Sequence, residues 1–269
     1  MPPRLRLAPT PSGYLHLGNG VNFAINALLA DRLGGRLLLR VDDLDRGRVR
    51  EAYLDDLAAT LRWLLPSRAE NLLTTATYQR QRLPAYRAAL DRLRENGEVY
   101  ACTCTRRQIR AAQAAAGRPA DVNDYPGTCR DLGIPLDTAG AAWRLRAPAG
   151  GDAADFVVRQ RDGTPAYQLA SVVDDVDLAV THVVRGEDLR PSTAMQRVLA
   201  EALARHDERF ARFAQIAIAH HPLILDEVGE KLSKSAGSTS LRAWRDAGRQ
   251  PSEVFARAEA MLADLVLQF

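Results

Sequence analysis

Short apolar runs alternate with segments of helical periodicity in the first part of the chain, and this order restricts the fold more than any other feature. Residues 5–8 and 37–41 have the composition of buried strands, and residues 22–33, 51–65 and 82–96 repeat apolar side chains at helical spacing. Strands that alternate with helices are typical of an α/β fold with a mainly parallel sheet. We therefore expect a Rossmann-like α/β architecture.

The regular alternation stops between residues 98 and 163, which are rich in Gly, Pro and Ala and contain all 3 cysteines. It resumes at residue 164 and includes a strand over 181–185, followed by a helix over 192–204. Residues 238–269 also have helical character. The predicted division is an α/β domain in two halves, 1–97 and 164–225, an insertion over 98–163, and a small helical C-terminal part over 226–269 that begins with a Lys-containing loop.

The charge balance is mildly basic, with a net charge of +3, which permits a nucleic-acid partner without requiring one. The chain has no apolar run of the roughly 18 residues that a membrane span needs, and its N-terminus lacks the apolar region of a signal peptide. We therefore expect a cytoplasmic protein without a membrane partner. An odd cysteine count in such a protein argues against a disulfide framework.

A glycine-containing loop joins the first predicted strand to the first predicted helix, and it carries His16, Gly18 and Asn19. The start of a helix offers free N–H groups and a positive dipole end, which suit a phosphate. His16 can donate to a phosphate oxygen, and Gly18 lets a nucleotide approach the backbone. An ordinary surface loop can have the same spacing, so this pattern alone is weak.

Lys231 and Lys234 are the only lysines among the 36 basic residues, and they share one loop with Ser and Gly neighbours. An ammonium group is a compact charge that can follow a migrating phosphate, whereas a guanidinium binds in a fixed fork. A plain surface turn in so arginine-rich a chain would be expected to contain Arg. We therefore interpret this segment as a loop that holds a triphosphate or pyrophosphate.

Together, the two loops resemble known signatures. His16-Leu-Gly-Asn19 resembles the HIGH motif of class I aminoacyl-tRNA synthetases, and Lys231-Leu-Ser-Lys-Ser235 resembles their KMSKS loop. Segments similar to the glutamyl-tRNA synthetase branch are Arg6–Gly13, Arg40–Asp45, Tyr78–Arg82, Tyr167–Asp175 and Val184–Leu189. Few residues follow Ser235, where full glutamyl-tRNA synthetases continue into an anticodon-binding region. With no anticodon-binding domain expected, the chain is more similar to the truncated glutamyl-queuosine tRNA(Asp) synthetase family.

This resemblance implies activation of L-glutamate by ATP with Mg2+, and transfer of glutamate to queuosine in the anticodon loop of tRNA(Asp), by a monomer. It implies catalytic roles for His16, Lys231 and Lys234, and ATP binding by these residues with Gly18, Asn19, Asp188 and Ser233. It implies glutamate binding by Arg6, Ala8, Thr10, Asp42, Tyr167 and Arg185. Asp42 departs from the family's usual Glu and is one methylene shorter, which leaves the affinity for the amino acid and its identity open.

Cys102, Cys104 and Cys129 offer three thiolates, and a tetrahedral zinc site needs a fourth ligand. Their spacing alone is equally consistent with inert buried thiols. The family pattern is Cys-x-Cys followed by Tyr-x-x-x-Cys, so the resemblance implies that Tyr125 is the fourth ligand of one structural Zn2+.

Three other functions stay open from the sequence. A minimal glutamyl-tRNA synthetase would charge a tRNA acceptor end, a different nucleotidyltransferase would share the first loop, and a non-catalytic RNA-binding paralogue would bind ATP without turnover.

Overall fold

The computed structural model describes residues 2–119, 121, 124–224 and 240–265. The chain forms two compact units, and both are discontinuous in sequence. The first unit comprises residues 1–81, 179–189 and 216–269, and the second comprises residues 82–178 and 190–215. The three sequence ranges of the first unit are far apart along the chain and therefore come together only through folding.

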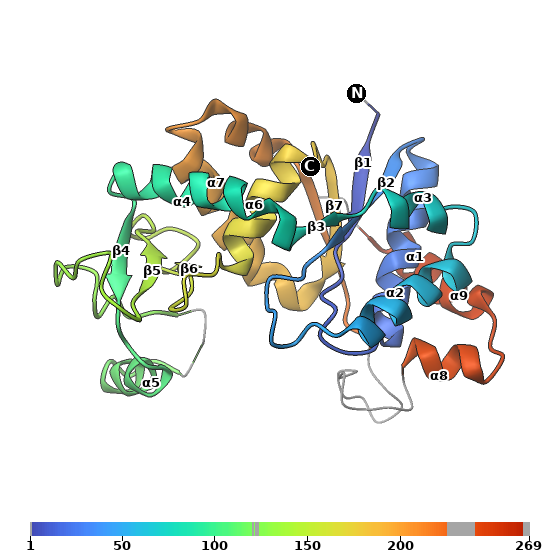
Figure 1. Ribbon diagram of the computed structural model, residues 1–269, viewed down its shortest axis with the longest axis horizontal. Coiled ribbons are helices and arrows are strands. Elements are labelled where there is room, and N and C mark those ends of the chain that lie inside the picture. The colour runs from blue at the N-terminus through green and yellow to red at the C-terminus, as the bar shows by residue number, and fades with distance from the viewer. Residues whose placement is uncertain (1, 120, 122–123, 225–239, 266–269) are drawn as a thin grey trace. The chain divides into compact units, whose positions relative to one another are not determined.

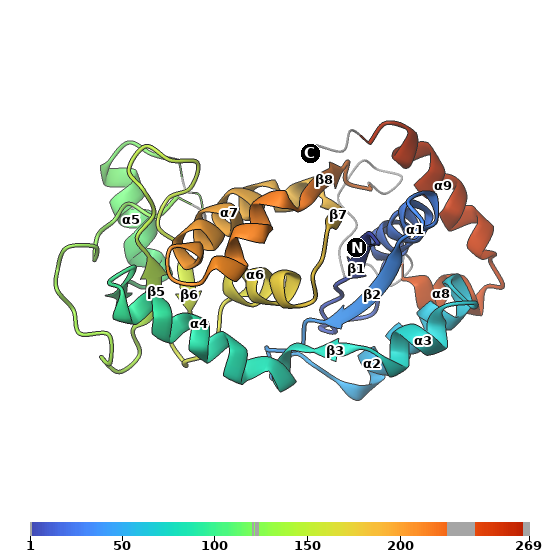
Figure 2. The same cartoon turned by 90° about the horizontal axis from the view of Figure 1, so that it is seen from above.

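The first unit is built on a parallel sheet (Figure 1). Its five strands have the order β3-β2-β1-β7-β8, which can be followed in Figure 2. Its strands are β1 (Arg4–Leu7), β2 (Arg36–Val41), β3 (Thr77–Tyr78), β7 (His182–Gly186) and β8 (Ala217–His221). The register pairs Leu5 with Leu37 on one side and with His182 on the other. This sheet confirms the predicted α/β fold.

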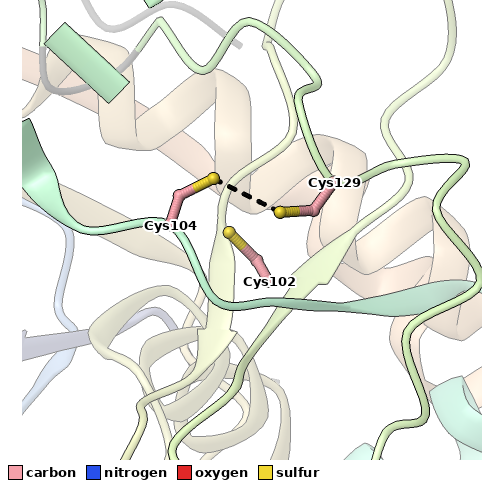
Figure 3. Close-up of side chains that lie close together, drawn as sticks. All are labelled: Cys102, Cys104 and Cys129. Carbon is pink, nitrogen blue, oxygen red and sulfur yellow. Dashed lines mark hydrogen bonds between the residues drawn. The ribbon is translucent and has the colours of Figure 1, made fainter. Parts of the chain in front are cut away.

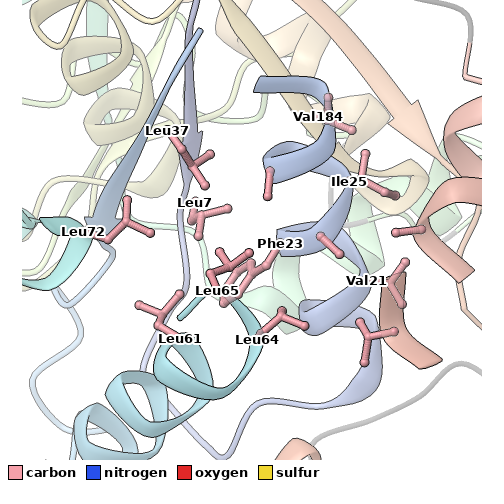
Figure 4. Close-up of a cluster of buried hydrophobic side chains, with 14 of the residues drawn as sticks. Leu7, Val21, Phe23, Ile25, Leu37, Leu61, Leu64, Leu65, Leu72 and Val184 are labelled. Atoms are coloured by element: carbon pink, nitrogen blue, oxygen red, sulfur yellow. The ribbon is translucent and has the colours of Figure 1, made fainter. Parts of the chain in front are cut away.

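The helices of the first unit are α1 (Leu17–Arg32), α2 (Glu51–Leu64), α3 (Ala69–Thr74), α8 (Leu241–Asp246) and α9 (Pro251–Ala263). Helix α1 lies between the sheet and α9 (Figure 2). Leu7, Phe23 and Leu61 belong to the buried core that joins β1, α1 and α2 (Figure 4). Gly20 lets α8 approach, because a Cβ there would lie 2.9 Å from Leu241 Cδ1.

The second unit contains an antiparallel sheet and a group of helices. The sheet has the order β4-β5-β6, formed by β4 (Val99–Cys102), β5 (Ala142–Leu145) and β6 (Val157–Arg159). The helices are α4 (Leu83–Glu95), α5 (Arg106–Ala115), α6 (Tyr167–Asp177) and α7 (Arg190–Ala204), with the 3-10 turn η3 (Glu208–Gln215). Asp174 ties α4 to α6, because its buried carboxylate accepts hydrogen bonds from Tyr86 and Arg82 at 2.8 and 2.5 Å.

The observed elements differ from the expected ones in a few places. Helix α1 begins at Leu17, five residues before the start expected at residue 22, because Gly18 and Gly20 hide its periodicity. The stretch expected to be irregular contains the three strands β4–β6 and the helix α5. No helix in the described part of the chain is long and apolar enough to cross a membrane.

Candidate active site and metal centre

The strand order of the parallel sheet places a topological switch between β1 and β7. The chain proceeds from β1 outward to β2 and β3 on one side, and the later strands β7 and β8 lie on the other side. In open α/β sheets, ligands bind at the carboxyl ends of the strands that flank such a switch. Ala8 and Thr10 follow β1, Asp42 follows β2 and Asp188 follows β7, so these predicted site residues share this edge.

Two predicted glutamate ligands lie on neighbouring strands and on one face of the sheet. Leu5, Leu7 and Val184 point into the core that contains α1. Because side chains alternate along a strand, Arg6 on β1 and Arg185 on β7 point to the opposite face. Each is only 4% exposed. The fold therefore places two buried guanidinium groups beside the switch.

Asp42 is already engaged by a neighbouring arginine. Arg40 donates through Nε to Asp42 Oδ1 at 2.6 Å and through Nη2 to Oδ2 at 3.1 Å. Both residues are buried, and the Asp42 backbone N–H donates to the Pro9 carbonyl at 2.9 Å. The Asp42 side chain therefore stays beside β2, where the bidentate ion pair with Arg40 orients its carboxylate. Arg40 begins the Arg40–Asp45 segment that is similar to the glutamyl-tRNA synthetase branch, but the resemblance implies no role for it.

The acidic residues around Asp42 have distinct environments. Asp43 accepts a hydrogen bond from the Arg80 backbone N–H at 2.9 Å, and burial raises the pKa of its carboxyl group. The Asp45 side chain is 56% exposed and forms a loose pair with Arg48 at 3.8 Å. Of the three, Asp42 is the one with a bidentate buried partner at the strand end.

His16 is the residue at which α1 begins. Its backbone N–H donates to Asn19 Oδ1 at 3.1 Å, and the Asn19 N–H donates back to the His16 carbonyl at 2.9 Å. A Cβ on Gly18 would lie 2.9 Å from His16 Cε1, so the absence of a side chain at residue 18 makes room for the imidazole ring. His16, Gly18 and Asn19 thus form one interlocked turn at a helix N-terminus.

The end of β7 is shaped around Asp188. A Cβ on Gly186 would lie 2.6 Å from Asp188 Oδ1, so a side chain at residue 186 would force that carboxylate to move. Asp188 lies in the 3-10 turn η2 (Glu187–Leu189) directly after the strand. Its charge also acts on His221 at the end of β8, which places both groups at the same edge of the sheet.

A buried contact between His221 and α1 has no signal in the amino-acid sequence. The His221 Nδ1 lies 2.8 Å from the Pro222 carbonyl, so this nitrogen carries the proton and donates it. Its Nε2 then accepts a hydrogen bond from the Asn22 amide at 3.1 Å, and that amide also donates to the Val184 carbonyl. Burial lowers the pKa of His221, which favours this neutral form. The contact fastens the end of β8 to α1.

The described structure does not test four of the predicted site residues. Lys231, Ser233 and Lys234 lie outside the described residues. Tyr167 begins α6 in the second unit and is 37% exposed. The roles expected for these four residues remain predictions.

The predicted metal ligands do converge within the second unit. The Sγ atoms of Cys102, Cys104 and Cys129 all lie within 4.8 Å of one another (Figure 3). Cys104 Sγ is 3.3 Å from Cys129 Sγ, and the Tyr125 hydroxyl is 3.4 Å from Cys102 Sγ and 3.6 Å from Cys104 Sγ. These separations suit a tetrahedron of donors around one ion, because Zn–S bonds of about 2.3 Å place the sulfur atoms a little under 4 Å apart.

The protonation of this cluster is uneven. Burial raises the pKa of Cys104 to about 11. Burial acts in the same direction on Cys129, but hydrogen bonds from Tyr125 and Cys104 outweigh it and lower that pKa to about 7. Burial and the neighbouring thiols raise the pKa of the Tyr125 hydroxyl. The guanidinium carbon of Arg144 lies 3.7 Å from the centre of the Tyr125 ring, where its positive charge favours a phenolate.

Comparisons with known proteins show which family the chain is similar to. The model of tRNA synthetases class I (E and Q), catalytic domain, matches residues 3–135 and 149–260. A Glutamyl-Q tRNA(Asp) synthetase of Nitratidesulfovibrio vulgaris is 38% identical over 99% of this chain and 88% of that protein. The one of Nocardia farcinica is 41% identical over 93% of this chain and 82% of that protein.

The chain belongs to the class I tRNA synthetase family. Its relatives named Glutamyl-Q tRNA(Asp) synthetase confirm the resemblance read from the motifs, and with it the assignment to class I ligases. A Glutamate–tRNA ligase of Geobacter sulfurreducens is 35% identical over 92% of this chain but only 54% of its own length. The crystal structure of a glutamate tRNA ligase from Elizabethkingia meningosepticum shares the fold, with a TM-score of 0.66 at 24% identity over 88% of this chain and 53% of that one.

Proposed function

We propose that this chain activates L-glutamate with ATP and transfers the glutamyl group to queuosine in the anticodon loop of tRNA(Asp). The observation that carries the proposal is the pair of buried arginines, Arg6 and Arg185, on adjacent strands at the switch of a class I synthetase sheet. The names of the relatives that cover most of the chain support the same acceptor.

In the first step, a glutamate α-carboxylate oxygen attacks the α-phosphorus of ATP, and the bond to pyrophosphate breaks. The product is glutamyl-adenylate, a mixed anhydride. In the second step, a hydroxyl of the queuosine cyclopentene diol attacks the anhydride carbonyl, loses its proton, and AMP leaves. No side chain needs to become acylated, so the chain contributes by orienting reactants and stabilising charge.

Individual roles follow from the placement of the side chains. A guanidinium from Arg6 or Arg185 can hold the side-chain carboxylate of glutamate by two parallel hydrogen bonds, which disfavours the neutral amide of glutamine. Asp42, oriented by Arg40, would receive the substrate ammonium group, and its short reach leaves room for a bridging water. His16 at the N-terminus of α1 would donate to a phosphate oxygen. Mg2+ would enter with ATP and neutralise phosphate charge.

The cysteine cluster would hold a structural Zn2+. Three thiol sulfurs and the Tyr125 hydroxyl lie close enough to bind one ion, and thiolate donors are those that zinc prefers. Four protein ligands leave no open position for chemistry. Zinc at this site would brace β4 and the loop that carries Cys129.

ATP–pyrophosphate exchange without tRNA, tried with each standard amino acid, tests the activation step. Exchange with glutamate alone supports the proposal, whereas exchange with a different amino acid refutes the assigned substrate. Arg185→Gln should abolish the preference for glutamate over glutamine, because it removes the charge complementary to the carboxylate. Arg36→Gln, at an exposed position at the start of β2, is the matched control.

A second candidate is glutamylation of a tRNA acceptor end, which the 35% identity to a Glutamate–tRNA ligase favours. Transfer of labelled glutamate to tRNA(Asp) that lacks its 3′-terminal adenosine separates the two. Queuosine-containing tRNA should still accept glutamate, and queuosine-free tRNA should not. Labelling that requires the terminal adenosine would select the second candidate.

A further inference from the structure

Asp56, in the middle of α2, joins three parts of the first unit. Its Oδ2 accepts a hydrogen bond from the backbone N–H of Leu15 at 3.2 Å, in the loop ahead of α1. Its Oδ1 accepts from Arg245 Nη2 of α8 at 2.7 Å. The Asp56 side chain is only 2% exposed and that of Arg245 only 16%. Arg245 also donates to the Thr60 hydroxyl, one turn further along α2.

The start of α8 holds the same loop from its other side. The backbone N–H of Leu241 donates to the Leu15 carbonyl at 2.7 Å, and Ser240 forms an isolated antiparallel bridge with His16. Arg242 donates to the Tyr14 hydroxyl at 2.9 Å. Both backbone polar groups of Leu15 are therefore bonded to residues far away in the sequence, and Leu15 is the immediate neighbour of His16.

A buried ion pair at this place calls for an explanation beyond stability. Removing two charges from water is costly, and replacing such a pair by apolar residues of similar volume is often neutral or stabilising. What a carboxylate adds is a fixed acceptor with two oxygens. Here one oxygen holds the loop of His16 and the other holds α8, so one side chain sets the distance between them.

We propose that Asp56 is a positioning residue for the adenylation step, and that Arg245 orients its carboxylate. Asp56 fixes the Leu15 peptide, and the Leu15 peptide fixes the direction in which the His16 backbone enters α1. The inference rests on the proposed function, in which His16 donates to a phosphate of ATP. It concerns the described residues 14–16, 56 and 240–245 only.

The kinetic test compares Asp56→Ala, Asp56→Asn and the control Asp55→Ala in ATP–pyrophosphate exchange. Asp55 is the adjacent, exposed carboxylate on α2. Asp56→Ala should lower kcat by roughly tenfold to a hundredfold, because a misplaced reacting group has that cost. The KM values for ATP and glutamate should change less than about twofold, because contacts to the bound substrates remain. Asp56→Asn should recover part of kcat, because its amide oxygen can still accept from Leu15.

A second readout needs no turnover. Hydrogen exchange of a peptide that covers residues 14–18, followed by mass spectrometry, should be faster in Asp56→Ala than in wild type and unchanged in Asp55→Ala. Should Asp56→Ala not fold, Asp56→Asn takes its place in both measurements. Unchanged exchange in residues 14–18, an undiminished kcat, or an equal loss in Asp55→Ala would overturn the positioning role. A folded wild type without pyrophosphate exchange would refute the proposed function instead, and hydrogen exchange would then decide the positioning role alone.

Discussion

Replacing Asp42 by Asn tests how much of the sheet's stability depends on the pair with Arg40. The Arg40 side chain is fully buried and that of Asp42 is 6% exposed. Asn keeps the volume and one acceptor but removes the charge, so the guanidinium stays buried beside a neutral amide. Removing one partner of a buried ion pair costs about 3–5 kcal/mol. Arg40 makes further interactions that would remain, so the lower end of that range, about 3 kcal/mol, applies.

The assay is thermal unfolding without substrate, which separates the effect on stability from any effect on activity. For a domain of this size, a loss of about 3 kcal/mol lowers Tm by roughly 6–12 °C. Asp45→Asn is the control, because its exposed pair with Arg48 at 3.8 Å contributes less than about 1 kcal/mol.

A double variant, Arg40→Met with Asp42→Asn, removes the charge that the single variant leaves unpaired. It should regain at least half of the lost Tm, because the penalty comes from an uncompensated buried charge. An Asp42→Asn protein as stable as wild type, or a double variant no more stable than Asp42→Asn, would refute the reasoning.

Three further predictions concern the metal centre, His221 and the reach of the side chain at residue 42. Arg144→Gln should weaken zinc binding, because the positive charge over the Tyr125 ring is lost, whereas Arg144→Lys should retain part of the affinity. Competition with a chromophoric chelator measures the affinity for zinc, and equal affinities of Arg144→Gln and wild type would contradict the prediction. Burial lowers the pKa of His221, so the unfolded chain protonates this imidazole at a higher pH than the folded chain does, and stability should fall as the pH drops below about 6.5. The Tm of His221→Gln should therefore decrease less than that of wild type between about pH 7.5 and 5.5. Asp42→Glu should lower the KM for glutamate in pyrophosphate exchange, because the longer side chain reaches the substrate ammonium group directly; an unchanged or higher KM would mean that the pocket has adapted to Asp.

Local patterns predicted the helices and strands with strong periodicity. Strand β2 and helix α2 were placed within one residue, and Gly34 and Gly97 both adopt the positive φ expected of helix-ending glycines. The strands β3 and β8 were missed because each depends on pairing with distant strands rather than on its own composition. The antiparallel sheet β4–β6 was missed for a similar reason, since long glycine- and proline-rich connections separate its strands.

The candidate site was predictable where motifs marked it and unpredictable where it depends on tertiary contacts. The convergence of Cys102, Cys104 and Cys129 with Tyr125 follows the pattern that the family resemblance supplied. Nothing local distinguishes Asp56 from Asp55, because only the folded chain brings Leu15 and Arg245 to one of them. The pairing of Arg40 with Asp42 was only weakly indicated by the sequence, since residues two apart in an extended segment point to the same side.

The packing of α9 on α1 has a consequence for synthesis on the ribosome. Val254, Ala258 and Leu262 complete a core whose other side chains come mostly from the first third of the chain, including Val21 and Ile25. A nascent chain that has emerged only through β8 therefore presents one flank of α1 uncovered, and the Leu15 carbonyl still lacks the N–H of Leu241. The core that begins with the first residues to be synthesised is completed only by α9, near the end of the chain. A stalled or truncated translation product should therefore expose apolar surface and become a substrate for chaperones and proteases.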